Sequence, residues 1–410
     1  MLFANLLNYT LRDTSVRLID SEGRSRIVGQ GDNPVCAIRI NNRHLDYKLI
    51  RNPGLFVPEA YMDGDLIIED GTLYDFIEAC ARNYHHLEAH PLFRVARWFD
   101  LAKLGQFNPM ARARKNVAHH YDLSEDLYAL FLDEDRQYSC AYFTETETDL
   151  ESAQLAKKRH IASKLLLKPG NKILDIGCGW GGLGLYLAQV ENVDVTGITL
   201  STEQFSVAQR RAEKAALSDR IGFRLQDYRK EKSTYDRIVS VGMFEHVGKR
   251  NYREFFETIR NLLHDDGVMV LHSIGRLDQP APINPFIRKY IFPGTDLPSL
   301  SEVMTVVEPL GLVVTDIEIL RLHYAETLRQ WRERFMKNRD EAVKIYDERF
   351  CRMWELYFVI CELGFRHQNL MVFQLQLAKN LDAVPLTRDY MIDWERRRAV
   401  EEGAKRQYAA

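Results

Sequence analysis

The stretch LDIGCGWGG (174–182) decides the fold of this 410-residue chain. It ends a short apolar run, KILDI (172–176), and places four glycines before a helical pattern: Gly177, Gly179, Gly181 and Gly182. Glycine lets a backbone turn tightly after a strand and approach a bound nucleotide closely. The stretch therefore predicts a strand, a tight turn and a helix that together hold a nucleotide-like ligand.

Strand-like and helical runs alternate after this turn. Four more short apolar or β-branched runs follow KILDI: VDVTGIT (193–199), IGFRLQ (221–226), YDRIVSVG (235–242) and GVMVLHSI (267–274). LGLVVTDIEIL (310–320) and LMVFQLQLA (370–378) supply two further strands. Such alternation indicates an α/β fold built on a parallel, doubly wound sheet, here of seven strands.

The chain is expected to divide near residue 100. Residues 1–100 contain short β-like runs (38–40 and 66–68) and a helical pattern over 73–81, which predict a small α+β domain. Residues 101–116 form a basic linker, and residues 117–410 form the larger domain. The linker's four cations are Lys103, Arg112, Arg114 and Lys115, and the linker either faces an anionic surface or is a solvated connector.

Charge and cysteine usage exclude several classes of protein. Lys and Arg total 55 against 58 Asp and Glu, a net charge of −3, which argues against a nucleic-acid partner. The six cysteines form no CxxC pair, so the sequence indicates neither a metal site nor a disulfide framework. No run approaches the roughly 20 apolar residues that span a bilayer. We therefore expect a cytoplasmic protein.

Prolines gather between residues 280 and 298. This segment holds five of the chain's 13 prolines and cannot form an ordinary helix or inner strand. We expect an excursion over the ligand-binding edge of the sheet. Its centre, FIRKYIF (286–292), mixes aromatic and cationic side chains, which suits either a lid at lipid headgroups or a plain surface loop.

The glycine turn alone leaves two ligand classes open, because dinucleotide binders and S-adenosylmethionine (SAM) methyltransferases share it. Asp175 and the later strand ends favour the methyltransferases. The second strand ends without the usual acidic residue, so Thr199 and Gln204 are the candidates for the ribose; Gln204 can instead belong to a capping box with Ser201.

The third strand is followed by Asp227 and Tyr228. A carboxylate at this position could accept a hydrogen bond from an adenine amino group, although Asp is also a common turn residue.

A second group of polar residues lies at the following strand ends. Glu245 and His246 follow the fourth strand, His272 and Ile274 end the fifth, and Tyr324 follows the sixth. Each has an ordinary structural reading, but the carboxyl ends of parallel strands meet at the edge where open α/β sheets bind ligands. Cys140 lies before the first strand and joins them only if the segment that carries it folds back.

Taken in order, the longer motifs resemble the cyclopropane-fatty-acyl-phospholipid synthase family over residues 114–378. They are HHYDLSEDLYALFLD (119–133), YSCAYF (138–143), LDIGCGWGG (174–182), GITLSTEQ (197–204), VGMFEHVG (241–248), HSIGR (272–276), YIFPG (290–294), LPSL (297–300), HYAETL (323–328) and FQLQLAK (373–379). The resemblance implies a Rossmann-like SAM-dependent methyltransferase sheet and a small N-terminal domain like a lipid carrier. It also implies transfer of a methylene group from SAM to the cis double bond of a phospholipid acyl chain.

The resemblance assigns site residues as well. Those implied to contact SAM, together with the glycine turn, are Tyr138, Ser139, Asp175, Gly177, Gly179, Thr199, Gln204, Asp227 and Tyr228. Those implied to hold a bicarbonate ion, a weak general base, are Cys140, Glu245, His272, Ile274 and Tyr324, with Cys140 and Ile274 acting mainly through backbone groups. Cys361, in CELGF, matches a cysteine given as an active-site residue in the family. No metal is required.

The family further implies an unsaturated phospholipid substrate, transient contact with the inner membrane from the cytoplasm, and a homodimer. Aromatic faces of Tyr142, Tyr290 and Phe292 are candidates for stabilising a carbocation. Two alternatives are an enzyme that leaves a methyl or methylene branch and a non-enzymatic lipid-binding protein. Thr295 stands where many members have a second glycine after YIFPG, which bears on substrate preference.

Overall fold

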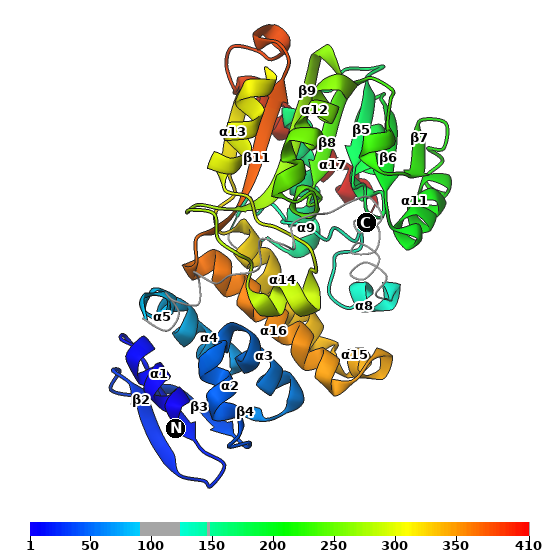
Figure 1. The fold of residues 1–410 in the computed structure, drawn as a ribbon. Coiled ribbons are helices and arrows are strands. Elements are labelled where there is room, and N and C mark those ends of the chain that lie inside the picture. The colour runs from blue at the N-terminus through cyan, green and yellow to red at the C-terminus, as the bar shows by residue number, and fades with distance from the viewer. Residues whose placement is uncertain (91–123, 146–147, 410) are drawn as a thin grey trace. The chain divides into compact units, whose positions relative to one another are not determined.

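A computed structural model of the chain describes residues 1–90, 124–145 and 148–409 (Figure 1). The expected linker, 101–116, lies outside the described residues. The chain divides into two compact units. Unit 1 comprises 1–104, 282–293 and 328–370, and unit 2 comprises 105–281, 294–327 and 371–410. Unit 1 therefore contains two segments that the sequence alone grouped with the larger domain.

Unit 1 is built on a four-stranded sheet in the order β2-β1-β3-β4. The strands are β1 (Ser15–Ile19), β2 (Ser25–Gly29), β3 (Pro34–Ile40) and β4 (Leu66–Asp70). Five short helices accompany them: α1 (Leu2–Thr10), α2 (Leu45–Arg51), α3 (Pro53–Asp63), α4 (Leu73–Arg82) and α5 (Tyr84–Ala89). The expected small α+β fold thus has strands at both predicted runs and a helix over the predicted 73–81 pattern.

The two later segments of unit 1 pack against this N-terminal part. α15 (Arg339–Ile345) and α16 (Glu348–His367) come from the second segment. The hydroxyl of Tyr61 on α3 donates to Glu355 of α16 at 2.9 Å. Lys289, in the proline-rich segment, donates to Glu59 at 2.6 Å. That segment contains a π-helical turn, Ile287–Ile291, where the sequence predicted only an irregular excursion.

Unit 2 contains the seven-stranded sheet that the sequence predicted, in the order β10-β11-β9-β8-β5-β6-β7 (Figure 1). The strands are β5 (Lys172–Ile176), β6 (Asp194–Thr199), β7 (Ile221–Leu225), β8 (Tyr235–Val241), β9 (Leu263–Arg276), β10 (Val313–Ile319) and β11 (Leu370–Ala378). The pairs β5–β6, β5–β8, β6–β7 and β8–β9 are parallel. β10 and β11 pair antiparallel, so the sheet is mixed and departs from the expected parallel pattern at this pair.

Helices cover both faces of this sheet because successive side chains of a strand point to opposite faces. On β5, Leu174 and Ile176 join a core with α12 (Tyr252–Leu262) and α13 (Leu300–Val307). Ile173 joins the other core, which includes α9 (Leu150–Lys164), α10 (Gly182–Val190) and α11 (Thr202–Lys214). Among the described residues, three further α-helices are α8 (Glu125–Ala129), α14 (His323–Lys337), which begins in unit 2 and continues into unit 1, and α17 (Asp389–Ala409), which packs on α9.

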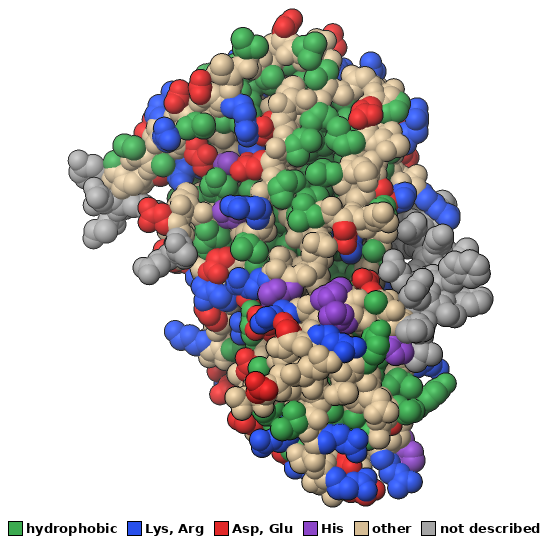
Figure 2. Space-filling model, turned by 90° about the vertical axis from the view of Figure 1, so that its left-hand side faces the viewer, with side chains coloured by type: hydrophobic (Ala, Val, Ile, Leu, Met, Phe, Trp, Pro, Cys, Tyr) green, Lys and Arg blue, Asp and Glu red, His purple; other side chains and the backbone are tan. Residues whose placement is uncertain are grey.

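The surface carries mixed charge. Figure 2 shows Lys and Arg side chains intermixed with Asp and Glu over one face, with hydrophobic side chains exposed among them. This distribution agrees with the near-neutral total charge. Within the described ranges, none of the helices combines the length and apolarity needed to cross a bilayer.

Candidate active site

A pocket opens at the carboxyl ends of the central strands of unit 2. Its wall is formed by the turns after β5, β6, β7 and β8 and by the segment 136–139. All nine residues predicted to contact a cofactor line it: Tyr138, Ser139, Asp175, Gly177, Gly179, Thr199, Gln204, Asp227 and Tyr228. The strand ends bring them together because parallel strands finish at one edge.

The glycine turn after β5 shapes the floor of this pocket. Gly177 has a φ of +81°, and a Cβ atom there would lie 2.8 Å from Cβ of Met243. At Gly182 a Cβ atom would lie 2.3 Å from Nε2 of Gln137. Both positions therefore need glycine, one for its backbone conformation and one for the close approach of the segment that precedes the sheet.

Two side chains of α9 hold the segment 137–139 against the pocket. Gln154 donates from Nε2 to the carbonyl oxygens of Gln137 and Ser139, at 3.1 and 2.9 Å. Lys157 is 1% exposed, and its ammonium donates to Oε1 of Gln137 and, at 2.9 Å, to Oγ of Ser139. Burial lowers the pKa of Lys157 to about 8. Lys157 thus brings a positive charge to a buried place where its hydrogen-bond acceptors are neutral.

Asp175 ends β5 beneath the glycine turn. It is 2% exposed, and among the described residues its Oδ2 atom has no hydrogen-bond partner. Burial raises the pKa of Asp175 to about 7, against the opposing effect of nearby Lys157. A buried carboxyl with an unused acceptor is suited to a ligand that brings a hydrogen-bond donor or a positive charge.

The end of β6 shows how Thr199, Ser201 and Gln204 share two roles. Ser201 caps α11 by accepting from the Gln204 amide at 3.3 Å, so half of the expected capping box is present. The Gln204 side chain does not complete the box. Its Oε1 atom instead accepts a hydrogen bond from the Thr199 hydroxyl at 3.0 Å. The pair is therefore available on the pocket wall for the hydroxyl groups of a ribose.

Asp227 is held by its neighbour Arg229. The guanidinium donates to both carboxylate oxygens, from Nε at 2.9 Å and from Nη2 at 2.7 Å. These bonds keep the pKa of Asp227 below its ordinary value although burial opposes them. Arg229 also lines the pocket, so the pocket wall after β7 contains a fixed, ionised carboxylate.

Glu245 and Ile274 meet at the next strand ends. Glu245 lies in a 3₁₀ turn (Phe244–His246) after β8, and Ile274 lies near the end of β9. The Ile274 amide donates to Oε1 of Glu245 at 2.6 Å. Among the described residues, the Oε2 atom of Glu245 has no partner. Burial raises the pKa of Glu245 to about 7 although the Ile274 bond opposes the shift.

His272 lies two residues before Ile274 on the same strand. The side chain is 2% exposed, and Nδ1 lies 3.2 Å from Nε2 of Gln374 on β11. Burial lowers the pKa of His272 well below its ordinary value, and the charge of Lys157 acts in the same direction. The ring is therefore a neutral imidazole at neutral pH.

A backbone contact links the segment that carries Cys140 to the helix that carries Tyr324. The Ala141 amide donates to the Thr327 hydroxyl at 3.0 Å, and Thr327 lies one turn after Tyr324 on α14. Cys140 and Tyr324 are 1% and 8% exposed. Burial raises the pKa of the Cys140 thiol. Cys140 and Glu245 each adjoin a pocket-lining residue, Ser139 and His246.

Cys361 belongs to unit 1, on α16, whereas the other predicted site residues belong to unit 2. It is half-buried, and burial raises the pKa of its thiol to about 12. Such a thiol is mostly protonated at neutral pH, which does not suit a nucleophile.

Tyr142 does not offer an open ring face. Its ring stacks on His160 at 4.0 Å between centroids and on His323 at 4.8 Å, nearly parallel to both. The carboxylates of Glu318 and Glu395 flank His160 at 2.7 and 3.0 Å and raise its pKa. Tyr142 therefore serves packing rather than stabilisation of a carbocation. Tyr290 and Phe292, the other candidates, lie in unit 1.

Sequence reasoning missed Lys157, Gln154, Gln374 and the pocket residue Trp180, whereas His246, expected beside Glu245 at this edge, does line the pocket. Trp180 stands inside the glycine stretch and packs against Tyr128 with ring centroids 5.1 Å apart. Burial lowers the pKa of His246 to about 4. In the residues that the structure covers, no three His, Cys, Asp or Glu side chains gather in a way that could hold a metal ion.

The chain is similar in sequence to several known proteins. The family model described as mycolic acid cyclopropane synthetase matches residues 109–375. The cyclopropane-fatty-acyl-phospholipid synthase of Escherichia coli (strain K12) is 37% identical over 363 residues, which cover 88% of this chain and 92% of that protein. The tuberculostearic acid methyltransferase UfaA1 of Mycobacterium tuberculosis is 35% identical and covers 91% of this chain and 90% of its own length.

Two solved structures are similar to this chain in both fold and sequence. The mycolic acid cyclopropane synthase CmaA1, in a complex with SAH and CTAB, has a TM-score of 0.62 at 34% identity and covers 66% of this chain and 99% of its own. The cyclopropane synthase MmaA2 from Mycobacterium tuberculosis has a TM-score of 0.63 at 34% identity, covering 67% and 99%.

Proposed function

This chain belongs to the mycolic acid cyclopropane synthetase family of SAM-dependent methyltransferases, and we propose that it transfers a methylene group from SAM to the cis double bond of a phospholipid acyl chain. One observation carries this proposal: all nine residues predicted to contact SAM line one pocket, and Glu245 joins Ile274 at the strand ends beside it.

The pocket fits SAM in its chemical character. The glycine turn allows close approach of the nucleoside, Thr199 and Gln204 face the ribose, and Asp227 accepts from the adenine amino group. Asp175, a buried carboxyl with an unused oxygen, pairs with the positively charged methionine end. The related CmaA1 was solved in a complex with SAH, which is SAM without its methyl group, and this supports the same use of the pocket.

The proposed reaction starts with the electrons of the double bond. They form a bond to the SAM methyl carbon while the sulfur–methyl bond breaks and its electron pair stays on sulfur. The acyl chain is left as a carbocation. Loss of a proton from the transferred methyl group lets that carbon–hydrogen bond pair close the three-membered ring. The site must therefore accept one proton without itself becoming methylated.

We further propose that the site holds a bicarbonate ion, which would supply the base for this proton. The chain's own residues fit such an ion. Glu245 has a buried oxygen with no hydrogen-bond partner among the described residues, and His272 has a neutral imidazole ring. When bound, bicarbonate supplies a weak general base that competes poorly for the methyl group. Glu245, His272, Tyr324 and the backbone near Cys140 hold it, and Ile274 orients the Glu245 carboxyl.

Glu245 and Lys157 have different electrostatic roles in the site. A carboxyl whose pKa lies near 7 exchanges protons at neutral pH, so Glu245 can take on the proton that the bound ion would receive from the substrate. The buried ammonium of Lys157 lies close enough to shift the pKa values of both Cys140 and Asp175. It offsets the negative charge that the ion and the carboxyls bring to this part of the protein.

The proposed substrate is a lipid of a membrane. We propose that unit 1 draws an unsaturated phospholipid from the inner membrane, that this contact is transient and cytoplasmic, and that the protein acts as a homodimer. The turn Ile287–Ile291 supports a lipid contact, because Lys289 is exposed beside the ring of Tyr290.

Incubation with SAM and liposomes of an unsaturated phospholipid tests the function. We expect acyl chains heavier by one CH2 and NMR signals of ring protons in the product. The absence of any heavier acyl chain would refute both the enzymatic function and the lipid substrate.

A branching methyltransferase is the second candidate, because UfaA1 is similar over 91% of this chain. Such an enzyme starts with the same methyl transfer but quenches the carbocation by a hydride shift, so the product carries a branch. Product NMR distinguishes ring from branch, whereas mass alone does not. A purely lipid-binding protein would produce neither.

A further inference from the structure

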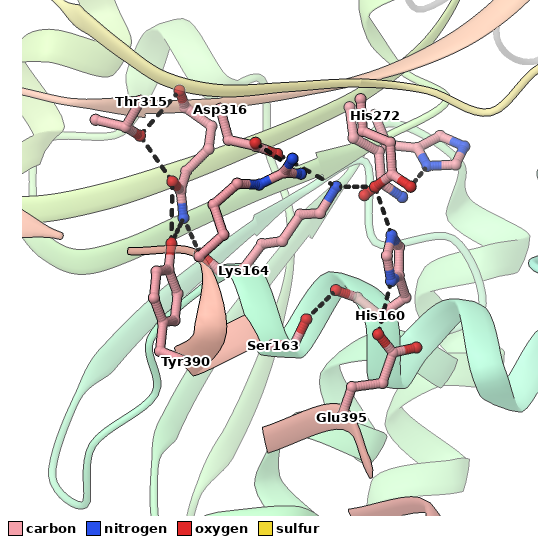
Figure 3. A network of polar contacts seen from close by, with 12 residues as sticks. His160, Ser163, Lys164, His272, Thr315, Asp316, Tyr390 and Glu395 are labelled. Atoms are coloured by element: carbon pink, nitrogen blue, oxygen red, sulfur yellow. Dashed lines mark hydrogen bonds and ion pairs between the residues drawn. The ribbon is translucent and has the colours of Figure 1, made fainter. Parts of the chain in front are cut away.

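Two glutamines lie in the interior of unit 2, on strand β11. Gln374 and Gln376 are 0% and 1% exposed. They alternate with Phe373, Leu375 and Leu377, which pack in the hydrophobic core on the other face of the sheet. Both side chains therefore lie on the opposite face, where Gln376 contacts Lys164 of α9 and Gln374 contacts His272. Figure 3 shows the polar contacts around His160, Lys164 and His272 in this part of the protein. Buried amides at consecutive inward positions need a reason, because apolar side chains would fill such positions without desolvating polar atoms.

Gln376 has a structural reason. Its Nε2 atom donates to the carbonyl oxygen of Lys164 at 2.6 Å and to the Tyr390 hydroxyl at 2.8 Å, and its Oε1 atom accepts from Thr315 at 2.7 Å. It thus ties β11 to α9, to α17 and to the neighbouring strand β10. Every polar atom of its amide has a partner.

Gln374 differs from Gln376 in its hydrogen bonds. The hydrogen bond of its side chain goes to His272, from Nε2 to Nδ1 at 3.2 Å, and its Oε1 atom is buried with no partner in the described part of the chain. An unpaired buried carbonyl is unfavourable, so folding stability does not explain this residue. What Gln374 contributes is its contact with the imidazole.

The direction of this contact decides where the ring proton lies. An amide nitrogen only donates, so Nδ1 of His272 has to accept, and an imidazole nitrogen that accepts carries no hydrogen. His272 is buried with a lowered pKa, so the ring holds a single hydrogen. With the Gln374 amide in this orientation, that hydrogen lies on Nε2, the ring atom that Gln374 does not contact.

The surrounding charges keep the ring neutral. Lys164 pairs with Glu318 and lies 3.7 Å from Asp316, while His160 donates to Glu318 and Glu395 (Figure 3). Arg388 also pairs with Asp316, at 2.9 Å. The groups nearest His272 in this layer, Lys164 and His160 together with Lys157, act against a second proton on the ring, and Glu318 only partly opposes them.

We propose that Gln374 is a positioning residue that fixes His272 as the Nε2–H tautomer, so that the imidazole donates a hydrogen bond to the anion in the reaction site. This inference rests on the proposed function for the identity of the anion. It does not rest on it for the tautomer, which is a property of the protein without substrate.

The first experiment measures the tautomer in the wild-type chain. Protein labelled with ¹⁵N at histidine is examined by long-range ¹H–¹⁵N NMR, and the His272 signals are assigned by their loss in His272→Gln. We expect Nδ1 to resonate as an unprotonated nitrogen and Nε2 as a protonated one. A protonated Nδ1 in the wild-type protein would overturn the proposal, whether or not the enzymatic function holds.

Two variants test the consequence. Gln374→Leu removes the donor, and we expect a mixture of tautomers and a fall in kcat of at least tenfold. Gln374→Glu keeps the shape but replaces the donor with an acceptor, so Nδ1 gains the hydrogen and the fall is larger. In both, the bicarbonate concentration for half-maximal rate rises while the Kd for SAM is unchanged. Wild-type kcat and bicarbonate dependence in both variants would overturn the proposal.

Gln376→Leu is the matched control, because it makes the same change two residues along the same buried face. We expect a lower Tm, from the loss of the side chain's hydrogen bonds to Lys164, Tyr390 and Thr315, with the tautomer and bicarbonate dependence of the wild type. If Gln376→Leu changed the His272 tautomer as Gln374→Leu does, the effect would belong to β11 as a whole, and the specific role of Gln374 would be refuted.

Discussion

The backbone amide of Ile274 donates a 2.6 Å hydrogen bond to Oε1 of Glu245, which joins the end of β9 to the turn after β8. The resemblance had implied that Ile274 offers its backbone to an anion. In the structure this amide instead orients the carboxyl of Glu245. The second oxygen of that carboxyl is buried and has no hydrogen-bond partner among the residues that the structure describes. A carboxyl fixed at one oxygen and open at the other is suited to exchanging a proton with a neighbouring ligand.

Glu245→Gln is expected to lower kcat by at least about 100-fold, because an amide at this position cannot accept a proton. The Kd for SAM, measured by calorimetry, should stay at its wild-type value, since Glu245 does not line the cofactor pocket. Glu213→Gln, at an exposed position of α11, is the control for surface charge. An equal loss of SAM affinity would make Glu245 a cofactor residue instead.

The rate should fall as the pH drops below about 7. The pKa of Glu245 is raised to about 7 by burial, so the carboxylate that accepts the proton is present above this pH and lost below it. The measurement is kcat against pH with the bicarbonate ion, rather than total carbonate, held constant. The residual activity of Glu245→Gln should lack this acidic limb; an identical limb in the variant would assign the titration to another group.

Asp175→Asn should stabilise the apo protein at high pH. The pKa of Asp175 is about 7 when folded against an ordinary 3.8, so between these values the folded state keeps a proton that the unfolded chain has released. Stability from this group therefore falls as the pH rises through that window. We expect the Tm advantage of the variant to grow from pH 5.5 to pH 8, on the order of 5 °C. A difference independent of pH would contradict the assignment.

Lys157→Met should weaken SAM binding by roughly tenfold, the effect of losing about one well-placed buried hydrogen bond. The ammonium holds Ser139 and Gln137 at the pocket wall, and methionine fills a similar volume without donating to either. Lys168→Met, at an exposed position after α9, provides the comparison. Titration calorimetry with SAM gives the result, and equal affinities would show that the segment 137–139 is held by other contacts.

Gly177→Ala should abolish SAM binding, whereas Gly170→Ala should only lower the Tm. Both glycines have a positive φ, +81° and +83°, so alanine strains the backbone equally at either place. A Cβ atom at position 177 would also lie 2.8 Å from Met243 on the pocket wall, while at 170 nothing lies within 4 Å. Similar SAM affinities in the two variants would mean that the pocket tolerates displacement of Met243.

Periodicity in the sequence predicted the strands well, because each strand is a local apolar run. LMVFQLQLA, expected as 370–378, is β11 with those bounds. The direction in which strands pair is not written in such a run, so the antiparallel pair β10–β11 was missed. The cofactor residues were predicted because they follow strands that end at one edge.

Lys157 and Gln374 were missed for a different reason. A lysine within a helix, or a glutamine within a strand, reads locally as a solvent-facing residue. Both are buried here because partners distant in sequence satisfy their donors: Ser139 for Lys157 and His272 for Gln374. One signal was present in β11, where Gln374 and Gln376 alternate with apolar residues in a sheet of the kind that helices usually cover on both faces.

The sequence by itself determined the order of strands and helices, the glycine turn and the side chains that stand at the strand ends, since these depend on neighbours within a few residues. Only the tertiary structure decided that residues 282–293 and 328–370 belong with the N-terminal unit and that Ile274 binds Glu245. It also decided which polar groups lose contact with water. Burial and hydrogen-bond partners depend on contacts between distant segments, and these set the protonation of Asp175, Glu245 and His272.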